Sequence, residues 1–449
     1  MAAKSTTRDM TSGTIWKHIL LFSIPLLIGN FFQQLYNTVD SVVVGNFVSS
    51  EALAAVGSTG PVINTLVGFF MGMSTGAGVV ISHYFGARDQ KRLHDAIHTT
   101  VLLTFILSIV FTIIGILMVP FMVSFMKTPS DVVAESTTYL RIYFAGVGGL
   151  MIYNMGSGIL RAVGDSRRPL YFLCISSVIN IVLDLLFVVG FHMGIEGVAY
   201  ATILSEVISA IMVLWVLTRT SDIYKLEWKE LRLSGIILKK VCIVGIPAGL
   251  QMAVTSFSNV FVQSYINHFG SSCMAGWTSY SKVDQFVLLP MMSLSLASTT
   301  FVGQNLGAHD AKRADKGMKT ALAMALGITV LLTIFINVAA TPLILLFTED
   351  VKVLEFGRIF LHFMSPFYVC CCFNQIHAGA LRGAGDANGP MLVMLSSFVV
   401  FRQIYLAITT HIVDNIYPVA FAYPAGWIVC TVAMFIYYNH AQKKQTYFT

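Results

Sequence analysis

The chain has 449 residues, of which 56% are hydrophobic and only 11% are charged, and its mean hydropathy is +0.74. Soluble domains usually carry about 25% charged residues, so this composition excludes an ordinary soluble protein and indicates a membrane protein. The formal net charge of +6 lies mostly in the connections between apolar segments, which argues against a nucleic-acid partner.

Apolar segments long enough to cross a bilayer recur along the whole chain. A spanning helix needs about 20 mostly apolar residues, because the hydrocarbon core is about 30 Å thick and a helix rises about 1.5 Å per residue. In chain order these segments are 15–39, 53–83, 94–121, 134–159, 169–191, 195–218, 238–267, 276–303, 318–346, 356–380, 390–412 and 416–438. The sequence therefore predicts an all-α integral membrane protein with twelve transmembrane helices, the first of which is too long for a cleaved secretory signal.

The longest polar connection divides the twelve segments into six and six. Most of the 28 Lys and Arg residues lie in the terminal tails and the even-numbered connections. By the positive-inside rule, both termini are therefore expected in the cytoplasm. The expected location is the cell (plasma) membrane, which the chain crosses several times and which in a bacterium is the inner membrane. The expected parts are a cytoplasmic tail at 1–13, an N-lobe at 14–218, a cytoplasmic linker at 219–237, a C-lobe at 238–438 and a cytoplasmic tail at 439–449.

Internal similarity relates the two halves. Three motifs of the first half return in the same order in the second, displaced by 221 or 222 residues: Phe85–Arg92 as Leu306–Arg313, Gly158–Asp165 as Gly379–Asp386, and Ile24-Pro25 as Ile246-Pro247. Because each repeat holds an even number of helices, we expect two six-helix bundles related by a pseudo-two-fold axis along the membrane normal, with a central cavity. The Gly- and Asp-containing motifs are interpreted as structural turns, in which Gly permits the turn and Asp accepts backbone N–H bonds.

Charged residues at bilayer depth are the main functional signal, since each costs about 2.5–3.5 kcal/mol at a helix centre even on permissive scales. The first half holds Asp40, at the predicted end of its helix, together with Asp184 and Glu206. Tyr36 and Asn180 each precede an aspartate by four residues, which puts each pair on one helix face.

These pairs could converge on one interior point, completed by Thr202 and Tyr139. Two carboxylates held close in a low dielectric cannot both ionise cheaply, so the site could take up H⁺, or Na⁺ through hard oxygen ligands. The alternative is that Asp40 lies hydrated in the outer interface while Asp184 only hydrogen-bonds between helices. Pro25 could act as a hinge in the first helix, or could make a static kink.

The second half has a different set of polar residues. The candidates for lining a substrate cavity, with Glu206 from the first half, are Gln251, Lys282, Asp284, Asn374 and Arg402. Arg402 could pair with Asp284 in a structural role, or could face the cavity. Lys282 and Asp284 are two residues apart and do not face each other on a helix.

Enzyme-like patterns are sparse. His94 and His98 lack a third metal ligand, the cysteines at 370–372 have no metal-like spacing, and no Walker-type phosphate loop is present. We therefore expect no enzymatic activity and no cofactor, with transport energised by an ion gradient.

The sequence resembles the multidrug and toxic compound extrusion (MATE) transporters over essentially the whole chain. The likeness rests on Ser23-Ile24-Pro25, Val39-Asp40, the paired Gly-Ala-x-Asp motifs, the paired Leu-Arg-x-x-Gly-Asp motifs, and Asn180 to Asp184. It implies two bundles around a cavity that opens alternately to either side, exporting mostly cationic or amphipathic organic molecules in exchange for H⁺ or Na⁺. It also implies an N-lobe site of Asp40, Asn180, Asp184 and Thr202, which would be the ligands if the ion is Na⁺, with Tyr36, Tyr139 and Asn154 nearby and protonation bending the first helix near Pro25.

The second lobe departs from one branch of the family, which places a Glu on helix 7 and an Asp on helix 10. The corresponding neighbourhoods here offer Thr255, and Cys371 or Asn374. The chain thus looks more like the DNA-damage-inducible-protein-F branch, in which coupling depends on the N-lobe aspartate. The alternatives are a lipid-linked oligosaccharide flippase of the same superfamily and, from another class, a membrane-embedded enzyme or receptor. We expect the lipid bilayer and small organic substrates as partners, and a monomer.

Overall fold

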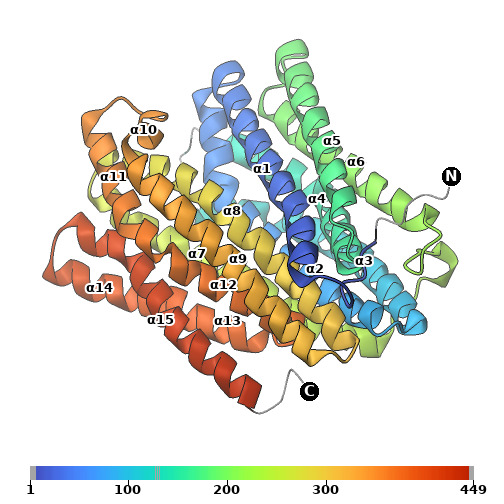
Figure 1. Ribbon diagram of the computed structural model, residues 1–449. Coiled ribbons are helices and arrows are strands. Elements are labelled where there is room, and N and C mark those ends of the chain that lie inside the picture. Colours follow the sequence, from blue (N-terminus) through green and yellow to red (C-terminus); the bar gives the residue numbers. More distant parts are fainter. Residues whose placement is uncertain (1–6, 127, 129, 131, 444–449) are drawn as a thin grey trace. The chain divides into compact units, whose positions relative to one another are not determined.

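The computed structural model describes residues 7–443, except 127, 129 and 131. Every regular element in these residues is a helix, which confirms the predicted all-α class (Figure 1). The elements are α1 (Ile15–Phe47), α2 (Ser50–Gly86), α3 (Gln90–Phe125), α4 (Val133–Ala162), α5 (Arg167–Asp184), η1 (Leu185–Gly190), α6 (Gly194–Arg219), η2 (Trp228–Glu230), α7 (Gly235–His268), α8 (Ser271–Gly307), α9 (Ala311–Val338), α10 (Ala340–Leu345), α11 (Val351–Met364), η3 (Ser365–Phe367), α12 (Tyr368–Gly383), α13 (Asn388–Leu395), η4 (Ser396–Phe401), α14 (Arg402–Ile412) and α15 (Ile416–Lys443).

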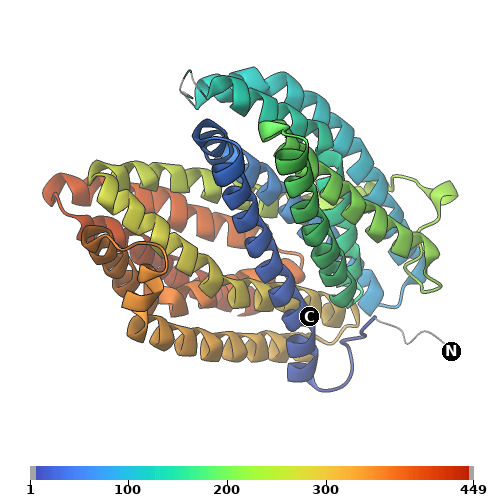
Figure 2. The same ribbon diagram turned by 90° about the horizontal axis from the view of Figure 1, so that it is seen from above.

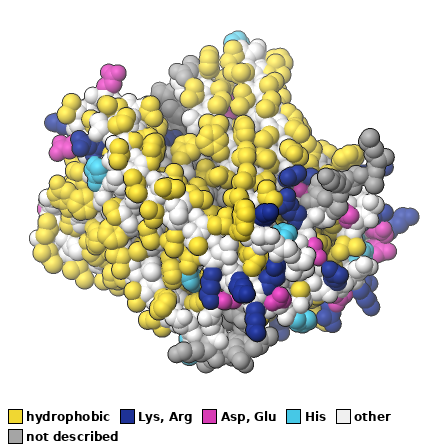
Figure 3. All heavy atoms as spheres, viewed as in Figure 1, with side chains coloured by type: hydrophobic (Ala, Val, Ile, Leu, Met, Phe, Trp, Pro, Cys, Tyr) yellow, Lys and Arg dark blue, Asp and Glu magenta, His cyan; other side chains and the backbone are white. Residues whose placement is uncertain are grey.

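Within the described residues, eleven helical segments are long and apolar enough to cross a membrane. They coincide with eleven of the twelve predicted spans. The remaining span, 134–159, is the helix α4, whose glycines, tyrosines and single Asn154 lower its hydropathy. Large apolar side chains lie exposed on the outer faces of the helices, as for Leu117 at 73% and Val338 at 82% exposure. Hydrophobic side chains also cover most of the face shown in Figure 3, as expected for a protein surrounded by lipid.

Several predicted spans are interrupted helices. The span 318–346 comprises α9 and α10 with a break before Pro342, and 356–380 comprises α11, η3 and α12 with Pro366 in the break. Proline lacks a backbone N–H and cannot continue the helical ladder. In 169–191 a π-helical segment ends the helix directly after Asp184, and in 390–412 one interrupts the helix directly before Arg402. π-helical turns are frequent at functional sites.

The chain forms two compact units. The first contains Pro25–Cys242, in which α4 packs against α2, α3 and α6, and α5 packs against α6. The second contains the chain from Ile243 onward, in which α8 packs against α9, α11 and α12, and α12 and α14 pack against α15 (Figure 1). Met10–Ile24 also belongs to the second unit. The division therefore falls inside two helices, at Pro25 of α1 and after Cys242 of α7, although α1 is one continuous helix (Figure 2).

The sequence repeat is reproduced in individual hydrogen bonds. Ser74 Oγ donates to the Asn154 carbonyl at 2.8 Å, and 221 residues later Ser295 Oγ donates to the Gln375 carbonyl at 2.7 Å. Glycine makes both contacts feasible, because a Cβ added at Gly158 would lie 2.3 Å from Ser74 Oγ. In the second unit, a Cβ added at Gly379 would lie 2.5 Å from Ser295 Oγ.

The repeated motifs form helix-terminating turns, which agrees with their structural interpretation. Asp89 accepts the N–H of Arg92 at 3.0 Å and Asp310 accepts that of Arg313 at 2.9 Å, each capping the helix that follows. The residue with left-handed backbone in these turns is not glycine but the residue before each aspartate. It is Arg88 in the first unit, with φ of 54°, and His309 in the second, with φ of 59°. In the other motif it is glycine, as predicted, at Gly164 and at residue 385, with φ of 85° and 90°.

Glycines on α4 set its close approach to α6. A Cβ at Gly146 would lie 2.3 Å from Ile203, and one at Gly156 would lie 2.8 Å from both γ-carbons of Val213. For a Cβ added at Gly149, the nearest atom would be the backbone nitrogen of Val207 on α6, at 3.0 Å. Small residues at such spacings allow two membrane helices to approach closely and to gain dispersion contacts.

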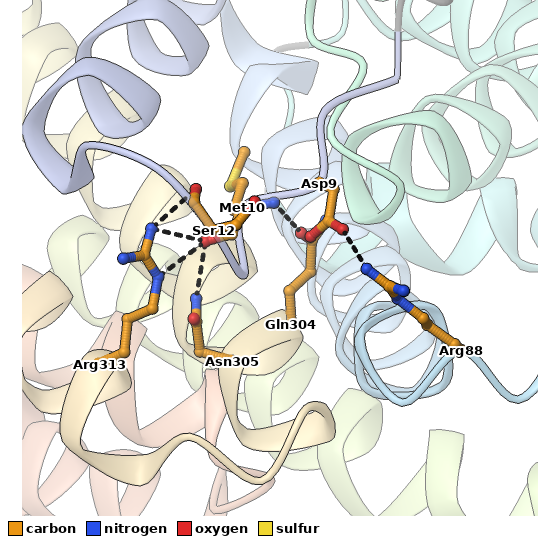
Figure 4. Close-up of polar contacts among 7 residues, drawn as sticks. All are labelled: Asp9, Met10, Ser12, Arg88, Gln304, Asn305 and Arg313. Carbon is orange, nitrogen blue, oxygen red and sulfur yellow. Dashed lines mark hydrogen bonds and ion pairs between the residues drawn. The ribbon is translucent and has the colours of Figure 1, made fainter.

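The segment before α1 is fixed on the second unit (Figure 4). Met10 is fully buried, and its N–H donates to Gln304 Oε1 at 3.0 Å. Arg313 donates to the carbonyl of Met10 at 3.2 Å and to those of residues 12 and 13 at 3.0 and 2.8 Å, and Asn305 also donates to the Met10 carbonyl. The preceding residue, Asp9, is instead paired with Arg88 of the first unit, at 3.3 Å.

Replacing Gly156 by Ala should destabilise the protein by about 1–3 kcal/mol, because the added methyl overpacks the α4–α6 contact. The measurement is the thermal unfolding temperature in detergent. Gly327→Ala on α9 is the matched control: no atom lies within 4 Å of its Cβ position, so it should be neutral or slightly stabilising. Equal effects of the two substitutions would contradict close packing of α4 on α6.

Arg313→Ala should release the segment that begins at Met10, because the carbonyls of residues 12 and 13 lose their charged donor. We expect faster amide hydrogen exchange in residues 10–14 than in the parent protein. Lys312→Ala, which changes an exposed neighbouring cation, should leave that exchange unaltered. Unchanged exchange in the Arg313 variant would mean that Gln304 and Asn305 hold the segment without it.

Candidate functional site

Seven of the polar residues singled out in the first half lie on four helices of the first unit. Tyr36 and Asp40 lie on α1, Asn180 and Asp184 on α5, Thr202 on α6, and Tyr139 and Asn154 on α4. Asp40 is not at the end of its helix, as the sequence suggested, because α1 continues seven residues further, to Phe47. The apolar residues Val42–Val44 continue the helix past the predicted boundary.

Two polar residues of α5, Asp184 and Asn180, are buried without a protein hydrogen-bond partner. Asp184 is 0% exposed and neither of its carboxyl oxygens receives a hydrogen bond. Asn180 is 1% exposed, and both ends of its amide lack a partner. Buried polar groups are normally satisfied, and an unsatisfied one costs about 1–3 kcal/mol, so this arrangement calls for a proton, an ion or water.

Asp40 and Asp184 meet each other. Their carboxyl groups lie within side-chain hydrogen-bonding range, and Asp40 Oδ1 is buried and has no protein donor. Two ionised carboxylates have no hydrogen to share, so the contact becomes a hydrogen bond only when one of the two carries a proton. The two residues are brought together from α1 and α5.

Aromatic hydroxyl groups and a third acid adjoin this pair. Tyr139 lies near both aspartates, and Tyr36 lies near Asp40 and Glu206. One oxygen of Glu206 is buried without a hydrogen-bond partner. Glu206, which the sequence grouped with the substrate-cavity residues, thus lies with the acidic cluster of the first unit. The tyrosine of α4 that also faces Glu206, Tyr143, was missed, although its i,i+4 spacing from Tyr139 could have indicated it.

The two other polar residues of this group have local partners. The Thr202 hydroxyl donates to the Val198 carbonyl at 3.0 Å, so its oxygen lone pairs stay available. Asn154 donates from Nδ2 to the Leu150 carbonyl at 2.9 Å. Asn154 therefore has a structural hydrogen bond of its own, in contrast to Asn180.

The second unit contains a cavity of about 350 Å³. Asp284 of α8, Arg402 of α14 and the predicted neutral residues Thr255 and Cys371 all contribute to its lining. Much of the remaining wall is aromatic: Trp277, Tyr280, Tyr423 and Trp427. The volume lies in the range of small-molecule sites, about 300–1,000 Å³.

Asp284 is held by tyrosines and not by Arg402. Its Oδ1 accepts hydrogen bonds from the hydroxyls of Tyr368, at 2.6 Å, and Tyr280, at 3.0 Å. The two hydroxyl oxygens are themselves 3.1 Å apart. Of the two alternatives for Arg402, the structure shows the cavity position and not the pairing with Asp284, whose carboxylate is held by two hydroxyl donors.

Arg402 makes other contacts. Its Nη2 donates to Asn259 Oδ1 at 2.8 Å and to Ser258 Oγ at 3.0 Å, and its guanidinium carbon lies 4.5 Å from the centre of the Tyr423 ring. Only 3% of the residue is exposed, and Nε has no hydrogen-bond partner.

The other predicted cavity residues do not line this cavity. Asn374 donates to the Trp427 carbonyl at 3.0 Å and accepts from Thr431 at 3.1 Å, which satisfies it between helices. Gln251 is buried and contacts Met394 Sδ at 3.0 Å. Lys282 lies on α8 beside Asp284 but is not among the lining residues.

The aromatic lining was missed, although a signal was present. Trp277, Tyr280 and Asp284 follow one another at spacings of three and four on α8, and Tyr423 and Trp427 are four apart on α15. Such spacings put side chains on one helix face. Tyr368 could not be found this way, because it reaches Asp284 from a helix 84 residues away.

The histidine pair has a structural arrangement. The rings of His94 and His98 stack with centres 3.8 Å apart. Nδ1 of His98 lies 2.7 Å from the carbonyl oxygen of His94, and Nε2 of His98 accepts the backbone N–H of Glu227 at 3.0 Å. Nε2 of His94 lies 3.0 Å from a carboxyl oxygen of Glu230. The pair thereby fixes the connection between α6 and α7 on α3.

Comparison with known proteins agrees with this two-unit plan. The MatE family profile matches the chain twice, at residues 25–186 and 247–408. The chain is 30% identical, over 97% of both chains, to the probable multidrug resistance protein YpnP of Bacillus subtilis. It is 25% identical to the probable multidrug resistance protein NorM of Thermotoga maritima, covering 85% of this chain and 83% of that protein.

A solved structure has the same fold. An outward-facing MATE family transporter of the MOP superfamily superposes with a TM-score of 0.90 at 25% sequence identity, covering 97% of this chain and 98% of that one. Both copies of the family profile begin at the proline of a repeated Ile-Pro motif, Pro25 and Pro247. With two matches to the family profile, relatives that are named multidrug resistance proteins and this structural likeness, the chain belongs to the MatE family of multi-pass membrane transporters.

Proposed function

We propose that the protein is a secondary active multidrug efflux transporter that moves cationic or amphipathic organic compounds outward by alternating access, against an inward flow of H⁺ or Na⁺. The observation that carries this proposal is the contact between Asp40 and Asp184, in which both carboxyl oxygens of Asp184 and Oδ1 of Asp40 are buried without a protein donor. The names of the relatives support the multidrug part. No cofactor is required, and the role is that of a transporter and not of an enzyme.

The aspartate pair suits proton coupling. Close carboxyl groups in a low dielectric favour a state with one shared proton, so the pair can gain and lose one proton as its access to solvent changes. Asn180 lies one turn before Asp184 on α5 and can hydrogen-bond with either protonation state, because an amide both donates and accepts.

The same residues could instead hold Na⁺. Hard cations prefer oxygen ligands, and the site offers the carboxylates of Asp40 and Asp184, the unpaired amide oxygen of Asn180 and the hydroxyl oxygen of Thr202. Tyr36, Tyr139 and Asn154 would surround the ion site. The DNA-damage-inducible-protein-F type of coupling, with the ion in the first unit alone, fits the absence of an acid at Thr255 and Cys371.

Pro25 is proposed as the hinge that links ion binding to motion. It lies inside α1, and because proline has no N–H the carbonyl of Leu21 lacks its usual helical partner. A helix with one missing ladder bond bends there most readily. A change of charge at Asp40, on the same helix, could thus alter the course of α1.

The flippase alternative has less support. Recognition of a pyrophosphate-linked lipid calls for several basic side chains, and Arg402 is the single basic residue that lines the cavity of the second unit. An acid, Asp284, lies in the same wall. We therefore keep drug efflux as the function that this cavity supports best.

Asp40→Asn should abolish export of a fluorescent organic cation in inverted membrane vesicles, because an amide cannot bind and release the coupling ion. The protein should remain folded and inserted. Asp414→Asn, the same change at a carboxylate whose side chain is 77% exposed, should transport normally. Undiminished export by the Asp40 variant would sink the coupling proposal.

Imposing one gradient at a time on proteoliposomes should identify the ion. If H⁺ is coupled, a pH gradient alone drives efflux and a Na⁺ gradient at equal pH does not; the reverse holds for Na⁺. Asn180→Leu should then weaken transport about tenfold or more under Na⁺ coupling, because an oxygen ligand is lost. Efflux that persists with neither gradient, and in the Asp40 variant, would argue against secondary transport.

A further inference from the structure

The cavity of the second unit carries one fixed charge of each sign. Asp284 projects from α8 and Arg402 from α14, and both line the same space of about 350 Å³. Among the residues that the structure describes, no ion pair joins them; each is held by neutral partners instead. Opposite charges in one cavity, kept apart by neutral hydrogen bonds, are arranged for a ligand that carries both signs.

The positive end is fixed in position while part of its donor capacity is unused. The two hydrogen bonds to Ser258 and Asn259 both come from Nη2 of Arg402, and the ring of Tyr423 covers the guanidinium at 4.5 Å. Nε has no acceptor although the residue is only 3% exposed. A buried guanidinium with an unused Nε–H has a geometry suited to a carboxylate, which accepts charge-assisted hydrogen bonds from it.

The negative end suits a delocalised cation. Both hydroxyl donors of Asp284 act on Oδ1, and the same wall holds Trp277, whose ring is stacked at 5.5 Å on that of Tyr423. Aromatic faces beside a carboxylate attract organic cations. A purely cationic ligand, however, would share this space with Arg402 and leave the unpaired guanidinium without an anion.

We propose that this cavity binds zwitterionic aromatic compounds, with the carboxylate at Arg402 and the cationic part between Asp284 and the aromatic wall. The inference deepens the proposed efflux function and rests on it for the direction of transport. Binding itself can be measured independently. Arg402 then acts as the residue that distinguishes carboxylate-bearing substrates from simple cations.

The test uses two fluorescent probes that differ in one group. Rhodamine 110 carries a carboxylate and a delocalised xanthylium cation, and rhodamine 123 is its methyl ester. Equilibrium binding to the full-length protein in detergent would be followed by fluorescence polarisation. The parent protein should bind rhodamine 110 the more tightly, and Arg402→Gln should weaken rhodamine 110 about tenfold while changing rhodamine 123 less than twofold.

Three further variants separate recognition from folding. Lys282→Gln removes a cation of α8, the helix of Asp284, that does not line the cavity, and should change the affinity for neither probe. Arg402→Lys keeps the charge but loses the planar fork, and should restore part of the rhodamine 110 affinity relative to Arg402→Gln. Asp284→Asn should weaken both probes, because both carry the cation.

The outcomes are distinct. An equal loss of both probes in Arg402→Gln would assign Arg402 a structural role and overturn the proposal, as would parent protein that binds rhodamine 123 the more tightly. If Arg402→Gln does not fold, Arg402→Lys takes its place, and an equal loss of both probes in that variant would overturn the proposal. Selective binding without rhodamine transport in energised vesicles would leave this site intact and count against the efflux function alone.

Discussion

In the hydrocarbon core of a bilayer no water satisfies a polar group, so each must be bonded within the protein or serve a ligand. Most hydroxyls of this protein obey the first rule by donating to a helix carbonyl, as Ser74 does between α2 and α4. Asp184 and Asn180 do not, although they are almost completely buried. Asp184 and Asn180 both lie on α5 of the first unit, and this contrast supports the ion site proposed there.

The two units share a scaffold while their interiors have diverged. The shared part includes the serine-to-carbonyl bonds, the helix-capping aspartates and the left-handed turn residues, all repeated 221 residues apart. At the same displacement, however, Asn180 corresponds to Phe401, Asp184 to Tyr405 and Glu206 to Trp427. Polar groups of the first unit thus give way to aromatic ones in the second. In the reverse direction, Asp284 corresponds to the apolar Ile63. Duplication supplied two equal bundles, and substitution at matching positions gave one an acidic centre and the other an aromatic cavity with both charges.

Local patterns explain which features could be predicted from the sequence. Hydrophobic length located the helices, and the repeat located the turns, because both depend on residues that are near one another in the chain. The end of α1 was placed too early because Asp40 looked like a boundary, whereas a buried partner on α5 accommodates it. The two alternatives for Arg402 stayed open for a related reason: choosing between Arg402 and Tyr368 as the partner of Asp284 requires the relative rotation of three helices, which periodicity alone does not determine.

The helix that bears Asp40 also connects the two units. Its first ten residues and the anchored segment before it belong to the second unit, and from Pro25 onward it belongs to the first. Arg313 and Gln304 fix the start of this segment through backbone atoms of Met10, so the start cannot shift without breaking several hydrogen bonds. With that end fixed, and with a ladder bond missing at Pro25, a force applied at Asp40 is relieved most easily by bending at the proline. In the proposed mechanism, the position of this proline between a fixed end and an ionisable group is the route by which ion binding would lead to motion.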